Sequence, residues 1–295
     1  MKKTLLKNTA GLMIAATLSL LSTHAFAEAG KLTFDVYNAG PQSFHVNAVV
    51  ITGDTETLLI DTGFTKADAL RIAAKVLDSG KPLKGIFISQ ADPDFYFGAE
   101  WLAEVFPDVP VITTPAVRDV IEKKMASKVD FWGPKLGDNA PVKPILPAAY
   151  TEKTLTVDGH TIEIRGTEGE LAHRPYLWIA DHKTLFGNIA VFGDLHLWTA
   201  DTQTEAQLDA WAAQLDTMLS LEPERVIPGH MATGTAMTRD AINYSKTYLG
   251  QFRDALAQSD NSDAVKAAMQ RDYPNAGLGI ALDIGAKVHK GEMPW

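Results

Sequence analysis

Hydrophobic and polar positions in the first half of the chain follow two spacings, one typical of strands and the other of helices. Thr65 and Asp68 form a capping box, and apolar residues from Ala69 to Leu77 fall on one face of a helix that Gly80 ends. β-branched and apolar runs predict strands at 31–36, 44–51, 57–60, 83–88 and 109–113. Further helices are predicted near 99–106 and from Pro115 to about Lys128.

The second half of the chain repeats this alternation. Asp158-Gly159 lies between two short strand-like runs, which is a strong β-hairpin signal, and a second hairpin is predicted over 176–186. Thr202 and Glu205 are predicted to cap an amphipathic helix. A strand at 225–227 and two helices reaching about Tyr273 complete the pattern. The element order predicts an α/β fold with two mixed sheets packed together and helices outside.

Between these halves, residues 129–150 contain four prolines and predict a long irregular loop. Phe131-Trp132 within it either line a pocket or anchor the loop to the core.

The N-terminal residues have the pattern of a secretory signal. Basic residues precede a short apolar run at 10–21, and Ala25-Phe26-Ala27 is a small-x-small cleavage site. About a dozen apolar residues are too few to span a bilayer, which needs roughly twenty. We therefore expect residues 1–27 to be a cleaved signal peptide and residues 28–295 to form a single exported domain, periplasmic or secreted, with no membrane span; an uncleaved anchor is the alternative.

Composition narrows the chemistry and the partners. The chain contains no cysteine, which excludes thiolate nucleophiles and thiolate metal ligands. Its formal net charge of −9 becomes more negative once a signal with three lysines is removed. An acidic surface disfavours nucleic acid and anionic membranes as partners, so a small-molecule substrate or ligand is expected. The sequence does not indicate an oligomeric state.

The loop Ser89–Gly98 joins a buried strand to a helix and carries Asp92 and Asp94 on either side of a proline. Two carboxylates this close share a cation, or one of them has a raised pKa. Alternatively, Asp94 is the N-cap of the following helix.

Four other acidic or histidine residues follow predicted strands, where α/β folds assemble their sites. His230 follows Pro228-Gly229, and Asp61 precedes Thr62-Gly63. His196, with Asp194, is expected on the same rim as the loop, as a substitute ligand or an acid–base pair. Each also has a structural reading, as a packing histidine or a turn-forming aspartate.

The order Leu59–Gly63, Ile88–Gly98 and Val226–His230 resembles the metallo-β-lactamase superfamily over roughly residues 44–230. The resemblance implies the αββα sandwich of that family and a metal site fed by a His-x-His-x-Asp-His loop. Here the motif is degenerate. Its four ligand positions hold Gln90, Asp92, Asp94 and Phe95.

Two more family positions also differ from the family pattern. The turn that usually supplies the next histidine falls near 166–171, where the chain reads Thr167-Glu168-Gly169-Glu170. The bridging aspartate falls at Asn188. The resemblance therefore implies at most a single divalent metal ion, held by Asp92, Asp94 and His230 with Glu170 or His173, while Gln90 adds an oxygen or holds a water. Such an oxygen-rich set suits Mn²⁺, Fe²⁺ or Mg²⁺ about as well as Zn²⁺.

Two hypotheses follow for the function. The first is an exported hydrolase in which a metal-bound water cleaves an ester, lactone or amide, with Asp94, Asp92 and His196 as catalytic candidates. The second is a non-catalytic binding protein that keeps the fold and its cleft. In this hypothesis Phe95, Tyr96, Phe97 and Trp198 line an apolar pocket. Loss of the usual ligands makes a β-lactamase or a nuclease a poor expectation.

Overall fold

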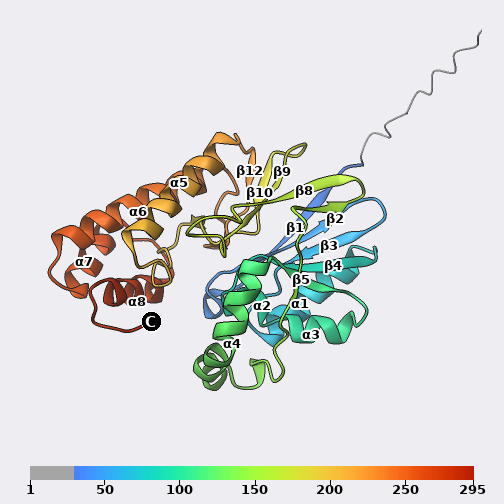
Figure 1. The fold of residues 1–295 in the computed structure, drawn as a ribbon, viewed down its shortest axis with the longest axis horizontal. Coiled ribbons are helices and arrows are strands. Elements are labelled where there is room, and N and C mark those ends of the chain that lie inside the picture. The colour runs from blue at the N-terminus through green and yellow to red at the C-terminus, as the bar shows by residue number, and fades with distance from the viewer. Residues whose placement is uncertain (1–29) are drawn as a thin grey trace, which may run out of the picture.

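The computed structural model describes residues 30–295 (Figure 1). The predicted signal peptide lies outside these residues, and the single domain over 28–295 stays a prediction. Within the described part, no helix is both long enough and apolar enough to cross a membrane.

The N-terminal half is built on a six-stranded sheet with the spatial order β1-β2-β3-β4-β5-β6. β1–β3 pair antiparallel, whereas β3, β4, β5 and β6 run parallel. Their carboxyl ends therefore meet at one edge, which is where the Ser89–Gly98 loop emerges. The strands are β1 (Thr33–Asn38), β2 (Asn47–Thr52), β3 (Thr57–Ile60), β4 (Leu83–Ile88), β5 (Val111–Thr113) and β6 (Ala148–Ala149).

Helices α1, α3 and α4 lie on one side of this sheet, and the second sheet lies on the other (Figure 1). The Thr65–Asp68 capping box at the start of α1 is confirmed. The elements of this half are α1 (Lys66–Asp78), α2 (Pro93–Tyr96), α3 (Ala99–Val105), α4 (Pro115–Leu136) and two 3₁₀ turns, η1 (Pro41–Ser43) and η2 (Gly137–Asn139).

The second sheet has five strands in the order β12-β10-β9-β8-β7, and a separate two-stranded ribbon pairs β11 with β13. Both predicted hairpins are confirmed, since β7 pairs with β8 and β9 with β10. The strands are β7 (Thr154–Val157), β8 (His160–Arg165), β9 (Tyr176–Ile179), β10 (Thr184–Phe186), β11 (Phe192–Gly193), β12 (Arg225–Val226) and β13 (His230–Met231). The C-terminal helices are α5 (Glu205–Ser220), α6 (Asp240–Gln258), α7 (Ser262–Asp272) and α8 (Gly279–His289).

The period of two along the strands explains how the layers pack. Val49 and Ile51 of β2 belong to one buried cluster with Ile162 and Leu177 of the second sheet. The intervening Val50 belongs to the other cluster, which includes the apolar face of α1. Alternate residues of one strand thus bury against the second sheet and against the helices. The predicted αββα sandwich is confirmed.

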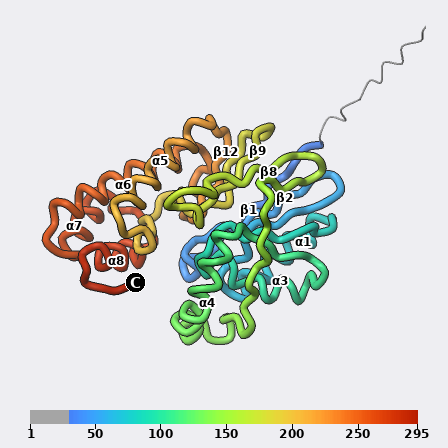
Figure 2. The backbone as a smooth tube through the Cα atoms, in the orientation of Figure 1, coloured from blue at the N-terminus to red at the C-terminus, as the bar shows by residue number. Residues whose placement is uncertain are grey.

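Three details of the prediction were wrong. α4 continues to Leu136, so the first part of the predicted 129–150 loop is helical, with Pro134 inside its last turn. The chain then crosses the N-terminal half to reach β7 (Figure 2). Helix α8 follows the two helices that were expected to be last.

The third error concerns the start of α5. The N-cap of this helix is Thr204, in a capping box with Gln207. Thr202 therefore caps nothing, and its hydroxyl instead accepts a hydrogen bond from Arg174.

Candidate functional site

The loop after β4 is held by Asp61, which follows β3 in a left-handed conformation (φ 65°). Its two carboxylate oxygens accept hydrogen bonds from the backbone N–H and the hydroxyl of Ser89, both at 2.7 Å. Burial raises the pKa of Asp61 to about 7, although the Ser89 hydrogen bonds oppose this rise. The last residue of the loop, Gly98, lies against the backbone that follows β3. Only glycine fits there, because a Cβ would lie 2.0 Å from the Thr62 carbonyl oxygen. Asp61 is thus a buried support of the loop.

Asp92 and Asp94 take different positions on the short helix α2. Asp92 is the N-cap residue, yet its side chain makes no capping hydrogen bond. Asp94 is the second residue of the helix, so its predicted role as N-cap was wrong. Burial raises the pKa of both carboxyls, and the charge of Asp92 adds to the rise at Asp94.

Asp94 faces His230 from across the molecule. Nε2 of His230 lies 3.6 Å from an Asp94 oxygen, while Nδ1 lies 2.9 Å from the Phe44 carbonyl oxygen. Since a carbonyl only accepts, Nδ1 donates and Nε2 is left with its lone pair toward Asp94. Burial lowers the pKa of His230 to about 4, so the ring is neutral at neutral pH.

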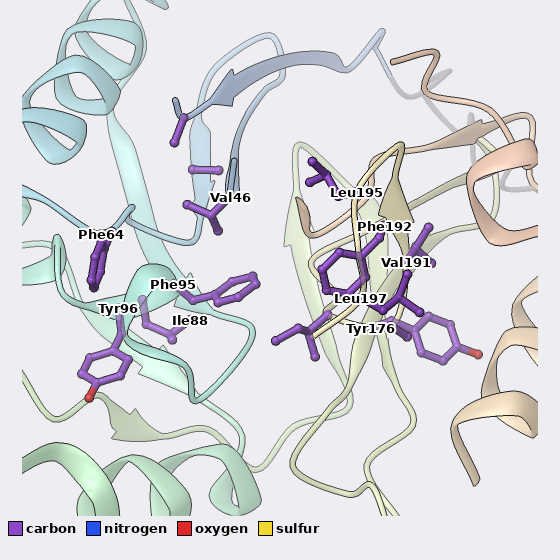
Figure 3. Packing of buried hydrophobic residues seen from close by; sticks show 14 of the residues in the cluster. Val46, Phe64, Ile88, Phe95, Tyr96, Tyr176, Val191, Phe192, Leu195 and Leu197 are labelled. Atoms are coloured by element: carbon purple, nitrogen blue, oxygen red, sulfur yellow. The ribbon is translucent and has the colours of Figure 1, made fainter. Parts of the chain in front are cut away.

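Two aromatic rings enclose His230. Phe192 stacks on it at 5.0 Å, and Phe95 meets it edge-on at 5.4 Å. Figure 3 shows Phe95 and Phe192 approaching each other from the two halves of the molecule. Phe95 stands at a position that aligns with a metal ligand of the family. Its aromatic ring therefore occupies the space beside His230.

An aromatic pocket opens next to this pair, and about 30 Å³ of it is accessible to the centre of a water-sized molecule. Its aromatic walls are Phe44, Trp132, Trp198 and Trp295, which come from both halves of the chain. Its polar lining consists of Asp92, Asp94, Lys128 and His230. Of the apolar lining that the binding hypothesis predicted, Trp198 is present. Phe95, Tyr96 and Phe97 instead are fully buried in the core.

A second, polar pocket shares Asp92 and Lys128 with the aromatic pocket. Gln90, Lys124, Arg174 and Asp201 also line it. Lys124 pairs with Asp201 at 2.9 Å, and Trp198 donates its indole N–H to the same carboxylate at 2.8 Å. These contacts and the charge of Lys128 hold the pKa of Asp201 below its usual range despite its burial.

The other predicted ligand positions are occupied structurally or lie elsewhere. Gln90 donates its amide N–H to the Pro175 carbonyl, which leaves Oε1 buried without a partner among the described residues. Asn188 accepts from the Val191 N–H and donates to the Ile227 carbonyl. Glu170 is exposed and lines neither pocket. His173 lines the polar pocket, where burial lowers its pKa to about 4.

The structure does not bring His196 to either pocket. Its Nδ1 lies 2.9 Å from the Tyr248 hydroxyl of α6, and its side chain is buried there. Asp194 accepts from Thr235 on the outside of the ribbon. A catalytic role for His196 stays a prediction that this geometry does not favour.

The residues present fit the metal site of the predicted hydrolase poorly. Among residues 30–295, one trio of metal-ligating side chains has donor atoms within 4.8 Å of one another, namely His160, Asp181 and His182 on the second sheet. The trio Asp92, Asp94 and His230 does not meet that condition. In addition, the side chains of Arg174 and Lys128 line the pocket that contains Gln90 and Asp92. Nearby positive charge opposes binding of a divalent cation.

The αββα architecture, with the Ser89–Gly98 loop at the carboxyl ends of the parallel strands, defines a hydrolase-like fold. The model of the metallo-β-lactamase superfamily matches residues 42–230, and the chain belongs to that superfamily. Its altered ligand positions make it a divergent member.

Solved structures support the same fold. A metallo-β-lactamase family protein from Thermus thermophilus aligns with a TM-score of 0.62 and 16% identity, covering 88% of this chain and 92% of that one. The B3 metallo-β-lactamase BLEG-1 aligns with a TM-score of 0.55 and 19% identity, covering 73% and 99%. A metallo-β-lactamase from Pontibacter korlensis gives 0.53 and 16%, covering 74% and 99%. No curated protein matches the sequence.

Sequence reasoning missed Arg174, Lys124 and Lys128, which supply the charge of the polar pocket. One available signal was an arginine directly before the apolar run Pro175–Ile179, since charged residues are seldom buried without a purpose. The two lysines on α4 carried no comparable signal, because a helix in contact with solvent usually bears such residues.

Proposed function

We propose that this chain is an exported small-molecule-binding protein of the metallo-β-lactamase superfamily that no longer uses metal chemistry. The observation that carries the proposal is the composition of the polar pocket. Gln90 and Asp92, aligned with metal ligands of the family, share this pocket with Arg174 and Lys128. Positive side chains thus line the pocket in which two of the aligned ligand positions lie.

The aromatic pocket supplies the binding surface. Large aromatic walls with a few polar groups are typical of small-molecule sites. Trp132 of α4, Trp198 after β11 and Trp295 each contribute one wall. Ligand binding should therefore change the intrinsic tryptophan fluorescence of the protein.

One observation favours the alternative of a single-metal hydrolase acting on an ester, lactone or amide. Nε2 of His230 and the nearest Asp94 oxygen are 3.6 Å apart, which is too far for a hydrogen bond and close to the spacing of two ligands on one ion. The Phe44 carbonyl also orients the ring, as partners of metal-bound histidines do.

Elemental analysis of the mature protein separates these two functions. The protein is equilibrated with excess Zn²⁺, Mn²⁺ or Fe²⁺ and then freed of unbound metal. We expect substoichiometric metal that is the same in wild type, Asp94→Ala and His230→Ala. One ion per chain that is lost in both variants would contradict the binding proposal and support the hydrolase. Export is tested separately, by the N-terminal sequence of the protein recovered from the cell envelope.

A further inference from the structure

Arg174 is a buried cation whose hydrogen bonding is incomplete. Its side chain lies in the interior, with the residue 4% exposed, and its guanidinium stacks over Trp211 at 5.3 Å. Nη1 donates to the Thr202 hydroxyl at 2.7 Å. Nη2 is buried and has no hydrogen-bond partner among the described residues. A buried arginine is normally satisfied by a carboxylate, and this one is not.

The charges around Arg174 do not neutralise it. Asp201 is already shared by Lys124 and the Trp198 indole. Lys128 forms no ion pair among the described residues, and its ammonium lies 4.6 Å from the centre of the Trp295 ring. The remaining carboxyl in this pocket is that of Asp92, whereas three cationic side chains, Lys124, Lys128 and Arg174, line it. The polar pocket therefore has an excess of positive charge.

The two pockets are adjacent and share lining residues. Asp92 and Lys128 line both of them. Trp198 presents its ring to the aromatic pocket, while its indole N–H holds Asp201 in the polar pocket. A single molecule that spans both pockets would place an apolar body against the tryptophans and a charged head beside Arg174.

We propose that the polar pocket binds the carboxylate of an amphipathic organic acid through Arg174 and Lys128, with the apolar body of that acid in the aromatic pocket. This inference rests on the proposed binding function and names its ligand class. A carboxylate in the polar pocket would pair with the guanidinium of Arg174, which lines that pocket, in the geometry that guanidinium groups favour. The free Oε1 of Gln90 additionally accepts a hydrogen bond from a hydroxyl or N–H next to the carboxylate.

The test compares phenylacetate with phenylacetamide, which share an apolar body and differ in the charge of the head. Binding to the full mature protein is measured by calorimetry and by tryptophan fluorescence. Because a hydrogen-bonded charge pair is stronger than a neutral hydrogen bond, we expect phenylacetate to bind about tenfold more tightly in wild type.

Three variants assign that preference to residues. Arg174→Met should abolish it by weakening the binding of phenylacetate far more than that of phenylacetamide, and Lys128→Met should reduce it severalfold. Asp92→Asn should keep or increase it, because the change removes a negative group from the pocket; a metal-dependent site would instead be weakened. Lys246→Met, which removes an exposed charge paired with Asp216 on the surface, is the matched control and should change nothing.

Failure of this inference is distinguishable from failure of the proposed function. Equal affinity for the two probes in wild type overturns the carboxylate site and leaves the binding function standing. A preference that survives in both Arg174→Met and Lys128→Met also overturns the carboxylate site. Absence of binding by both probes overturns both proposals. If Arg174→Met fails to fold, Lys128→Met with the Lys246→Met control still decides the question.

Discussion

Asp61 and Arg174 are both buried charged residues, but their surroundings differ. Each oxygen of Asp61 accepts a hydrogen bond from Ser89, within a loop that also depends on Gly98. Arg174 has one nitrogen bonded to Thr202 and another with no partner among the described residues. The Asp61 site is complete within the described residues, whereas the Arg174 site would be completed by the proposed ligand.

This difference shows which parts of the family architecture the chain retains. The loop support around Asp61 belongs to the fold and is intact. The ligand positions of the Ser89–Gly98 loop have lost their histidines, and cationic side chains line the pocket that contains Gln90 and Asp92. Stability should therefore be sensitive to changes around Asp61 and tolerant of changes around Arg174.

The largest expected effect is that of Gly98→Ala. A Cβ at Gly98 would lie 2.0 Å from the Thr62 carbonyl oxygen, which is backbone and cannot move aside without shifting Asp61. We expect a loss of about 3 kcal/mol in the free energy of unfolding, measured by urea denaturation. Gly250→Ala is the control, because Gly250 lies within α6 with nothing near its added Cβ, and should stabilise by about 0.5 kcal/mol. Equal effects of the two changes would refute the clash.

Asp61→Asn should have the next largest effect, with a defined pH dependence. The folded pKa of Asp61 is about 7, above that of an unfolded aspartate. Between about pH 4 and pH 7 the folded state therefore retains a proton that the unfolded chain has released, and the contribution of Asp61 to stability falls as pH rises.

An asparagine at this position does not titrate, so the cost of Asp61→Asn should be greatest at low pH. We expect about 2 kcal/mol near pH 5 and clearly less near pH 8, from urea denaturation of both proteins. Titration of other groups, including His230, cancels in the difference between the two proteins. A cost that grows with pH would contradict the raised pKa of Asp61.

Arg174→Met should raise stability in the absence of ligand by about 1 kcal/mol. Methionine keeps the contact with Trp211 and removes a buried charge that lacks a full set of partners. Thermal unfolding without added carboxylate measures the change. A large loss of stability would show that Arg174 serves the fold, and the comparison with Asp61 would then fail.

An effect of the same size but opposite sign is expected for Thr202→Val. This change removes the hydrogen bond that the Arg174 guanidinium donates to Thr202, at a cost of about 1 kcal/mol. The effect should vanish in an Arg174→Met background, which a double-mutant cycle tests directly. Thr33→Val, at an exposed position on β1, is the control and should be nearly neutral.

Much of the fold was predictable because local signals agreed with the tertiary structure. The capping box at Thr65 and the Asp158-Gly159 hairpin form in the expected places, and the sandwich was confirmed. The wrong helix limits have local causes. Thr204 and Gln207 made a better capping box than Thr202 and Glu205, and Pro134 was tolerated in the last turn of α4.

The site was predictable in part. The sequence pointed to Asp92, Asp94 and His230, and these three do line one pocket, although their roles there remain predictions. It also pointed to Glu170 and His196, which the structure places outside both pockets. Arg174, Lys124 and Lys128 come from distant parts of the chain, and no local pattern relates them to Asp92.

The sequence by itself determined the family, the sandwich and the loss of the usual metal ligands, because these depend on residue identity and on local periodicity. Only the tertiary structure decided what replaced those ligands. The charge of a pocket depends on which side chains meet there and on whether their partners are already taken. Asp201 forms an ion pair with Lys124 and accepts a hydrogen bond from the Trp198 indole. One buried nitrogen of the Arg174 guanidinium has no hydrogen-bond partner among the described residues.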